Sequence, residues 1–452
     1  MRALFRINKK GGNLAAVFVH LSDIHFGQEK EPGQLIINKD ARDRLIDDAA
    51  SVVRRSVKGK ASGIIVTGDI AYAGQKHEYQ AAGEWLDRLA EKVGCEPSDL
   101  QMVPGNHDVD RSRFRGATEL MLNSIREGGE PKLNSFLAEE VDREVLYHRF
   151  EAYREFADAY HCPLNCEGVS TAERLVELAK GRSIRFVRIN SALTCLKSSR
   201  DDLGKLLLGA GQRVMKATPG EELIVLTHHP LSWLADSEEM KRYLRGRARV
   251  LISGHEHLAS VECEEVEEGT HLVSLAAGAT TPDQIDSVYT YSYNVIEFDW
   301  DEGQDALTLA VETRVWNNEL KRFDSNAGGA EKLTLGSPNF RAGPRPQKAP
   351  LGDLGDKSEV AKVEIRLPEM TAVLPRMVDI SERQNLHLHF FRDLGAEARL
   401  NVFHEIGTLP PGFKGALNHA TASDLFNSSI VEKGFENVRA AITAELMRQK
   451  KG

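Results

Sequence analysis

The sequence predicts an α/β layer fold followed by a small, mostly helical region. Over the first two thirds of the 452 residues, short β-branched runs alternate with amphipathic helical stretches. This alternation is typical of strands and helices packed in layers. After His257 the apolar residues recur at every second position, which indicates antiparallel strands. A stretch rich in Gly and Pro then separates this part from a helical C-terminus.

Six apolar runs in the first part have the length and composition of buried strands. Between them the apolar residues are spaced by three and four, for example over residues 40–57 and 78–93, which predicts helices. The predicted strands are residues 15–21, 63–67, 100–103, 184–189, 223–227 and 250–253.

The rest of the first domain contains an insertion and a set of later strands. Residues 111–182 carry mostly helical periodicity, so we predict a helical insertion there. Residues 272–275, 293–298 and 307–316 are predicted as antiparallel strands that close a second sheet. The first domain is therefore predicted to span residues 1–335.

The remaining residues are predicted to form a linker and a second domain. Residues 336–358 are rich in Gly and Pro and have no period, as expected of a linker. Residues 359–452 are predicted to form a small, mostly helical domain, with one strand at 363–367 and a last helix over 435–446. Its pattern is similar to the small helical adaptor modules of bacterial conflict-system effectors. A dimerisation element or a lid is an equal alternative.

The bulk composition predicts an ordinary globular protein of the cytoplasm. A formal net charge of −9 argues against a generally basic surface that coats nucleic acid, although a local basic channel stays open. The chain has no apolar run near the roughly 18 residues of a membrane helix, so we expect no membrane association. We interpret the apolar residues 14–21 as the first core strand rather than a signal peptide. Five cysteines, an odd number, favour reduced thiols.

Five short polar segments each follow a predicted strand. Loops at the ends of adjacent strands allow a rigid sheet to gather distant residues into one cleft. Carboxylate, carboxamide and imidazole ligands suit Mn²⁺, Fe²⁺ or Fe³⁺, Zn²⁺ or Ni²⁺ rather than a soft thiolate site, and Mn²⁺ is favoured. The segments are Asp23-Ile24-His25, Gly68-Asp69, Gly105-Asn106-His107-Asp108, His228-His229-Pro230 and Gly254-His255-Glu256-His257.

This ordered set resembles the calcineurin-like metallophosphoesterase superfamily over about residues 15–320. The sequences of three segments resemble those of large prokaryotic members: Leu21-Ser-Asp-Ile-His-Phe-Gly27, Thr67-Gly-Asp-Ile70 and Val103-Pro-Gly-Asn-His-Asp-Val-Asp-Arg111. The resemblance implies a four-layer αββα sandwich with a dinuclear metal site. It implies one ion held by Asp23, His25, Asp69 and His257, and a second held by Asp69, Asn106, His228 and His255, with Asp69 bridging.

The resemblance further implies hydrolysis of phosphate esters by a hydroxide that two divalent ions activate. His107 would contact a phosphoryl oxygen or protonate the leaving group, and Asp108 would orient its imidazole. We also predict substrate contacts for Asn106, Arg111 and His229. At least two of the three arginines at positions 111, 113 and 115 are expected to form a solvated cluster instead.

The predicted substrates are phosphodiesters of nucleotides or nucleic acids. A phosphate monoester is largely dianionic, and enzymes that select it often add arginine donors, but the five segments contain no arginine. Arg143, Arg149 or Arg154 of the insertion could still favour a monoester, so a phosphomonoesterase or protein phosphatase is one alternative. A signalling or binding protein with an inactive phosphoesterase domain is another, although no ligand is missing. A protein partner or self-association is expected through the C-terminal domain.

Overall fold

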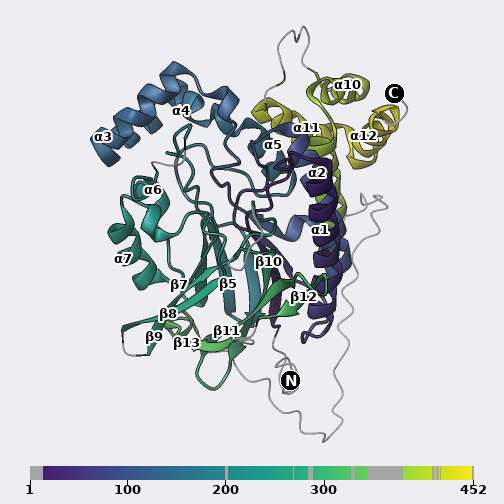
Figure 1. Ribbon diagram of the computed structural model, residues 1–452. Coiled ribbons are helices and arrows are strands. Elements are labelled where there is room, and N and C mark those ends of the chain that lie inside the picture. The colour runs from purple at the N-terminus through teal and green to yellow at the C-terminus, as the bar shows by residue number, and fades with distance from the viewer. Residues whose placement is uncertain are drawn as a thin grey trace, which may run out of the picture.

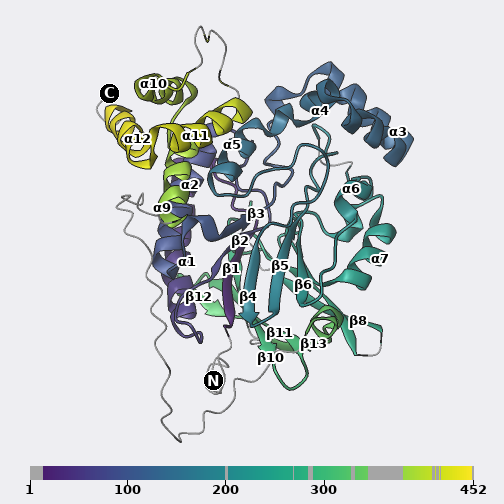
Figure 2. The ribbon, with the colours of Figure 1, turned by 180° about the vertical axis from the view of Figure 1, so that it is seen from behind.

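The computed structural model has two β-sheets that face each other, with helices on their outer sides (Figures 1 and 2). The four-layer α/β architecture expected from the sequence is therefore confirmed. No described helix is both long enough and apolar enough to cross a membrane. The structure describes residues 14–198, 202–267, 269–283, 289–326, 331–344, 380–409, 413, 417 and 419–449.

The first sheet combines the amino-terminal strands with strands from around residue 300. Its order is β12-β11-β10-β1-β2-β3, and β13 also pairs with β11. Strand β1 runs parallel to β2 and antiparallel to β10. The strands are β1 (Ala16–Leu21), β2 (Gly63–Val66), β3 (Leu100–Met102), β10 (Ser292–Asp301), β11 (Ala306–Asn317), β12 (Arg322–Ser325) and β13 (Glu331–Leu335).

The second sheet has the order β4-β5-β6-β7-β9-β8. Strands β5, β6, β7 and β9 run parallel, whereas β4 and β8 pair antiparallel at the two edges. The strands are β4 (Leu175–Ala179), β5 (Arg182–Arg188), β6 (Glu221–Leu226), β7 (Ala248–Ser253), β8 (Ser260–Glu267) and β9 (Thr270–Ala276).

The prediction that three later strands close a second antiparallel sheet is wrong in its pairing. The strands predicted at 293–298 and 307–316 are β10 and β11, and they extend the first sheet beside β1. The strand predicted at 272–275 is β9, which pairs in parallel with β7 as well as antiparallel with β8. A period of two identifies a strand with one buried face, but it does not identify the neighbouring strand.

Alternate residues of the central strands face different layers of the core. In β1, Phe18 lies between the two sheets, where its ring is 5.1 Å from Phe186 and 6.1 Å from Phe298. Val17 and Val19 point the other way, into the core beneath α1 (Pro32–Arg54) and α2 (Lys76–Val93). Helices α6 (Ala210–Arg213) and α7 (Ser237–Arg247) lie on the side of the second sheet.

The insertion after the third strand contains three helices, but its predicted bounds of 111–182 are wrong at the end, because β4 lies within them and pairs with β5 in the second sheet. Helix α3 bends at Gly129, where φ is 63°. Its helices are α3 (Gly116–Ala138), α4 (Glu140–Tyr147) and α5 (Glu151–Ala159). Shorter 3-10 turns occur at Pro97–Asp99, Arg111–Arg113, His148–Phe150 and Leu231–Trp233.

The first part of the predicted linker packs against the sheets instead. Helix α8 (Pro338–Ala342) buries Phe340, and the Asn339 side chain donates to the Glu222 carboxylate at 3.1 Å. The apolar ring and this contact anchor the segment on β6, which composition alone could not indicate. The strand predicted at 363–367 and most of the linker lie outside the described residues.

The described C-terminal residues form four helices and one short π-helical turn, His389–Asp393. Their apolar residues belong to the same hydrophobic core as α1, α2 and α5. The helices are α9 (Ile380–Leu388), α10 (Ala396–Ile406), α11 (His419–Lys433) and α12 (Phe435–Gln449). An adaptor, oligomerisation or lid role for these C-terminal helices stays a prediction.

Arg392 is inserted between α2 and α5. Its guanidinium pairs with Asp87 and lies 3.1 Å from the hydroxyl of Tyr160, which itself donates to Asp87. Gly83 makes room, because a Cβ there would lie 3.0 Å from the Arg392 side chain. A glycine inside a helix costs about 0.5–1 kcal/mol relative to alanine, so the close approach of Arg392 accounts for the glycine.

Candidate metal centre

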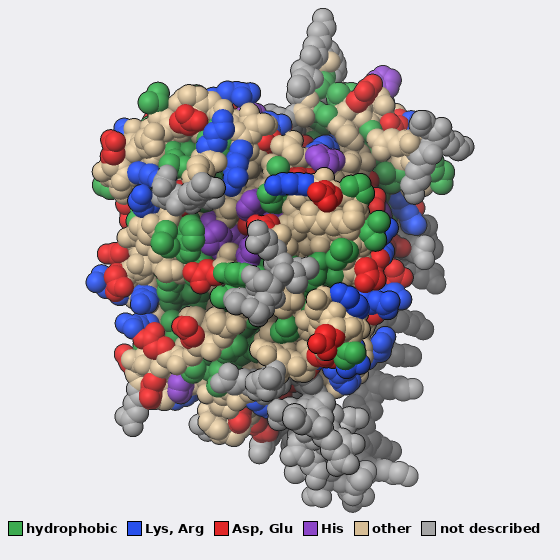
Figure 3. All heavy atoms as spheres, viewed as in Figure 1, with side chains coloured by type: hydrophobic (Ala, Val, Ile, Leu, Met, Phe, Trp, Pro, Cys, Tyr) green, Lys and Arg blue, Asp and Glu red, His purple; other side chains and the backbone are tan. Residues whose placement is uncertain are grey.

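The predicted ligands all lie just beyond the carboxyl ends of five strands. Each follows its strand by two to four residues: Asp23 and His25 follow β1, Asp69 follows β2, Asn106 follows β3, His228 follows β6, and His255 and His257 follow β7. Because these strands come from both facing sheets, the loops meet at one edge of the sandwich. We call these seven residues the ligand cluster. Figure 3 shows histidine side chains gathered in a hollow of the surface, with Lys and Arg side chains above them.

One half of the ligand cluster centres on Asp23 and His25. The Nε2 atom of His257 lies 3.2 Å from Oδ1 of Asp23. The Nε2 atom of His25 lies 3.4 Å from Oδ2 of Asp69. The four residues predicted to hold the first ion therefore face one another.

The other half centres on His228. Its Nε2 atom lies 3.3 Å from Oδ2 of Asp69, 3.2 Å from Oδ1 of Asn106 and 3.1 Å from Nδ1 of His255. The same Asp69 oxygen thus approaches His25 of the first predicted set and His228 of the second. This is the position that a bridging carboxylate requires.

The backbone of the ligand cluster is strained. Asp23, His25, Asp69, His255 and His257 all have positive φ, between 51° and 74°. Such values are uncommon for residues other than glycine, and strained conformations of this kind concentrate at functional sites. The surrounding structure therefore holds these side chains in place at an energetic cost.

Glycines next to the ligands allow close packing of the loops. A Cβ at Gly68 would lie 2.6 Å from the His228 ring, and one at Gly105 would overlap the Asp69 carboxylate. A Cβ at Gly254 would overlap Ser22, which adjoins Asp23. The three glycines are therefore required for the loops to approach one another.

Burial and neighbouring charges shift the pKa values of three histidines in the ligand cluster. Burial alone would lower the pKa of His25, but the hydrogen bond and charge of Asp69 raise it to about 9. The pKa of His228 is also raised to about 9, because the charge and hydrogen bond of Asp69 outweigh the lowering effect of burial. Burial and the nearby His228 lower the pKa of His255 to about 3.

The donor set fits divalent metal ions. Ligand atoms of Asp23, His25 and His257 lie within 4.8 Å of one another, and so do those of Asp23, Asp69 and His228. Oδ1 of Asp23 is buried and has no hydrogen-bond partner among the described residues. An unsatisfied buried carboxylate oxygen that faces an imidazole nitrogen is explained by a cation between them.

His107 lies beside the cluster, but Asp108 does not orient it. The Nδ1 atom of His107 is 2.7 Å from the carbonyl oxygen of Tyr72, and the two rings stack at 5.0 Å. The Asp108 carboxylate instead accepts from the backbone N–H of Ile70, Ala71 and Gly105, at 2.9 to 3.1 Å, and from Tyr79. Asp108 therefore connects the loops of Asp69 and Asn106, because its buried carboxylate faces backbone donors rather than the imidazole.

The arginines after Asn106 have different environments. Arg113 donates to Asp110 at 3.1 Å and pairs with Glu151, and exposed Arg115 contacts the Ser112 carbonyl. Arg111 is half-buried, and its guanidinium has no hydrogen-bond or ion-pair partner among the described residues. Burial lowers the pKa of His107, and the Arg111 charge acts in the same direction, so the guanidinium lies within electrostatic range of that imidazole.

His229 lies behind the cluster. Its side chain is 1% exposed, with Nδ1 2.9 Å from the Ser191 hydroxyl and Nε2 4.0 Å from the Cys195 sulfur. Both ring nitrogens therefore face protein groups, and the predicted substrate contact of His229 finds no support in this arrangement. Sequence analysis also missed Tyr72 and Trp233, which touch His107 and His255. Their positions shortly after ligand segments were the available signal.

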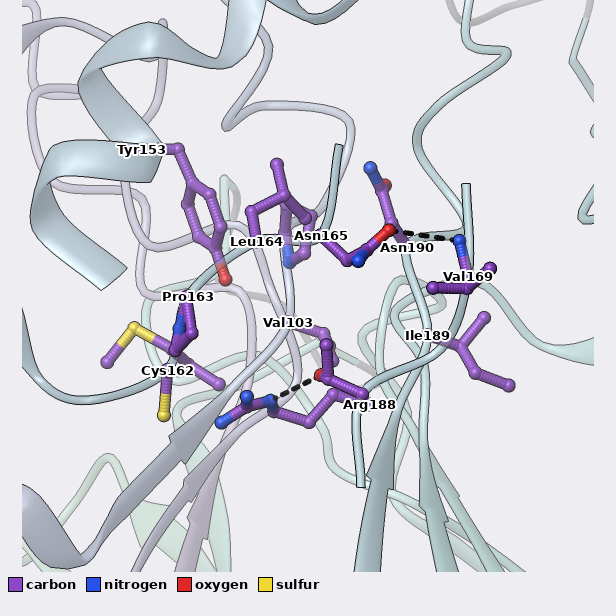
Figure 4. A pocket seen from close by; sticks show the side chains of 13 residues that line it. Val103, Tyr153, Cys162, Pro163, Leu164, Asn165, Val169, Arg188, Ile189 and Asn190 are labelled. Carbon is purple, nitrogen blue, oxygen red and sulfur yellow. Dashed lines mark hydrogen bonds between the residues drawn. The ribbon is translucent and has the colours of Figure 1, made fainter. Parts of the chain in front are cut away.

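A small pocket lies between β3, β5 and the insertion (Figure 4). Its volume is about 20 Å³, enough for about one water molecule. The buried Cys162 lines it, with its thiol against the carbonyl of Leu100, whereas Cys166 contacts Leu164. The pocket is too small for a phosphate ester, and the two cysteines do not converge.

Comparison with known proteins identifies the family. The family model of the calcineurin-like phosphoesterases matches residues 16–259, more than half of the chain. The chain belongs to the calcineurin-like phosphoesterase family. The uncharacterised metallophosphoesterase-like protein YydB of Bacillus subtilis (strain 168) is 26% identical over an alignment of 337 residues, which covers 72% of this chain and 64% of YydB. The match thus spans less than two thirds of that relative.

Two solved structures have lower sequence identity to this chain. Purple acid phosphatase PPD1 from yellow lupin seeds is 12% identical, with a TM-score of 0.40, over 76% of this chain and 58% of the phosphatase. Zn²⁺-bound wild-type Vps29 from Entamoeba histolytica is 10% identical, with a TM-score of 0.29, over 70% of this chain and 98% of Vps29.

Proposed function

We propose that this calcineurin-like protein is a metal-dependent phosphoesterase that prefers phosphodiesters of nucleotides or nucleic acids. The observation that carries the proposal is the position of Asp69, whose Oδ2 lies 3.4 Å from His25 and 3.3 Å from His228. A single carboxylate oxygen placed between two sets of ligands is suited to a pair of cations. Family membership supports the same reaction class.

The seven residues of the ligand cluster would hold two divalent cations, with Mn²⁺ favoured for their mixture of oxygen and nitrogen donors. When bound, such a pair lowers the pKa of water and offsets the charge of a phosphoryl group. The oxygen of Asn106 lies 3.2 Å from Nε2 of His228, where it would contact an ion of the second set and, through that ion, a bound phosphate.

His107 and Arg111 would act on the substrate directly. The Tyr72 carbonyl accepts the Nδ1–H of His107, so the other ring nitrogen is left for the substrate. A ring nitrogen of His107 lies within 4.8 Å of ligand atoms of His25 and Asp69. His107 can therefore hydrogen-bond a phosphoryl oxygen or deliver a proton to the leaving oxygen. The unpaired Arg111 guanidinium would donate to a non-bridging oxygen.

The contacts that the nearby arginines already make favour a diester over a monoester as the substrate. Arg149 is fully buried and donates to the carbonyls of Leu146 and Cys195, and Arg143 donates to that of Leu137. The Arg149 guanidinium is therefore not available to a phosphate, and one nitrogen of Arg143 is already occupied. Arg154 has no side-chain partner among the described residues, but its charge acts on Tyr147 and Cys166 and not on His107. Arg111 is the one arginine near His107 for which the described residues offer no partner. One cationic side chain suits the single charge of a diester better than the two charges of a monoester.

The test is kcat/KM for bis(p-nitrophenyl) phosphate against p-nitrophenyl phosphate, measured on one preparation loaded with Mn²⁺. We expect the diester to be hydrolysed faster. The Asp69→Ala variant, purified identically, controls for contaminating phosphatases and should be inactive on both. A tenfold or larger preference for the monoester would reject the diester proposal in favour of a phosphomonoesterase. Absence of both activities would instead indicate a binding protein.

A further inference from the structure

An indole ring lies against one end of the ligand cluster. Trp233 ends the 3-10 turn Leu231–Trp233, which begins three residues after His228. Its ring centroid is 4.1 Å from that of His255 and 5.7 Å from that of His229. Trp233 and His255 are both only partly buried. Part of the indole therefore remains exposed beside His255.

Hydrogen bonding does not explain the presence of an indole at this position. The Nε1–H group of Trp233 is buried and has no acceptor among the described residues. Tryptophan usually pairs this donor when it is buried. Trp233 packs partly against the hydrophobic core of the second sheet, and its ring also presents an aromatic surface beside a predicted metal ligand.

Tyr289 and Arg111 add a second aromatic ring and a positive charge near the ligand cluster. Tyr289 is 38% exposed and lies at the other end of the cluster, with its ring 6.5 Å from that of His257. Arg111 lies five residues after Asn106, is half-buried, and has no hydrogen-bond or ion-pair partner among the described residues. An aromatic surface next to a phosphate site and an unpaired arginine is the combination that binds nucleotides, because bases stack on aromatic rings and Arg pairs with phosphate.

We propose that Trp233 determines specificity by stacking on a nucleobase, so that the preferred substrates are nucleotide diesters. This inference rests on the proposed phosphodiesterase function and narrows its substrate class. Removal of one stacking aromatic side chain weakens the binding of a base by roughly 5- to 100-fold. A purely structural role of Trp233 against His255 would instead reduce the hydrolysis of all diesters equally.

Two substrates with the same leaving group separate these roles. We would measure kcat/KM for thymidine 5′-(p-nitrophenyl phosphate) and for methyl p-nitrophenyl phosphate, both with Mn²⁺-loaded enzyme. Because the p-nitrophenolate is common to both, their ratio reports the contribution of the nucleoside. We expect the ratio to fall by about 5- to 100-fold in Trp233→Ala and Trp233→Leu, and by less than about threefold in Trp233→Phe, which keeps an aromatic ring.

The matched control is Tyr243→Ala, on α7, where Tyr243 contacts Arg247 and lies outside the ligand cluster. Its ratio should equal that of the wild type. An unchanged ratio in both Trp233→Ala and Trp233→Leu would reject the stacking proposal. If Trp233→Ala loses metal by elemental analysis, the Leu and Phe variants decide by the same ratio. Wild-type protein that cleaves p-nitrophenyl phosphate but neither diester would reject the diester function itself.

Discussion

Phe391 tests whether the C-terminal helices share a core with the rest of the protein. The side chain is 1% exposed, and its ring lies 4.5 Å from that of His387 and 4.9 Å from that of His419. The guanidinium of Arg399 lies 5.3 Å above the ring. On its other side Phe391 lines a cavity of about 20 Å³ together with residues of α2 and α5, including Tyr79.

We predict that Phe391→Ala lowers the free energy of unfolding by about 3.5–6 kcal/mol. Removal of a buried phenyl ring costs about 3–5 kcal/mol, because the lost transfer energy is combined with a new cavity. Loss of the contact with Arg399 adds about 0.5–1 kcal/mol. Whole proteins of this kind are typically stable by about 5–15 kcal/mol, so the effect should be easy to measure.

The assay is guanidinium unfolding followed by both circular dichroism and phosphoesterase activity. Val431→Ala is the control, because Val431 is 81% exposed on α11 and should change the free energy of unfolding by less than about 0.5 kcal/mol. A loss below about 1 kcal/mol in Phe391→Ala would refute the shared core. So would an early circular-dichroism transition with the midpoint of activity unchanged, since the C-terminal helices would then unfold independently.

Three further predictions concern the metal centre and the C-terminal contact. Asp69→Ala should lower metal content more than Asn106→Ala, because Asp69 would bridge both ions; equal and full occupancy by elemental analysis would disprove bridging. His107→Ala should keep its metal but lose on the order of 10²–10⁴ in rate, and loss of metal would make His107 a ligand. Burial lowers the pKa of His387 from 6.5 to about 4, so the unfolded chain takes up a proton at this residue between those pH values and the folded chain does not. Stability should therefore fall as the pH drops through this window, and unfolding midpoints at pH 7 and 5 should differ less in His387→Gln.

The sequence alone was sufficient to predict the fold class and to identify the candidate metal ligands. Strand periodicity and the alternation of strands with helices depend on residues close in sequence, so they can be read without coordinates. The five polar segments could be expected to lie at strand ends because each directly follows a predicted strand. Only the structure shows that these strands belong to two facing sheets whose ends meet at one edge. Asp69 illustrates this: its place after β2 predicts a central position, and the structure puts it between His25 and His228.

The tertiary structure decided which distant groups meet. The period of two in β10 could not indicate that the strand pairs with β1, which lies nearly 300 residues earlier. Asp108 adjoins His107 in sequence but faces Tyr79 and three backbone N–H groups, because a buried carboxylate takes whichever donors the fold places around it. The docking of Arg392 beside Gly83 likewise depends on the packing of helices far apart in sequence. Local patterns specify elements, whereas the contacts between elements depend on shape and charge complementarity that only the folded chain contains.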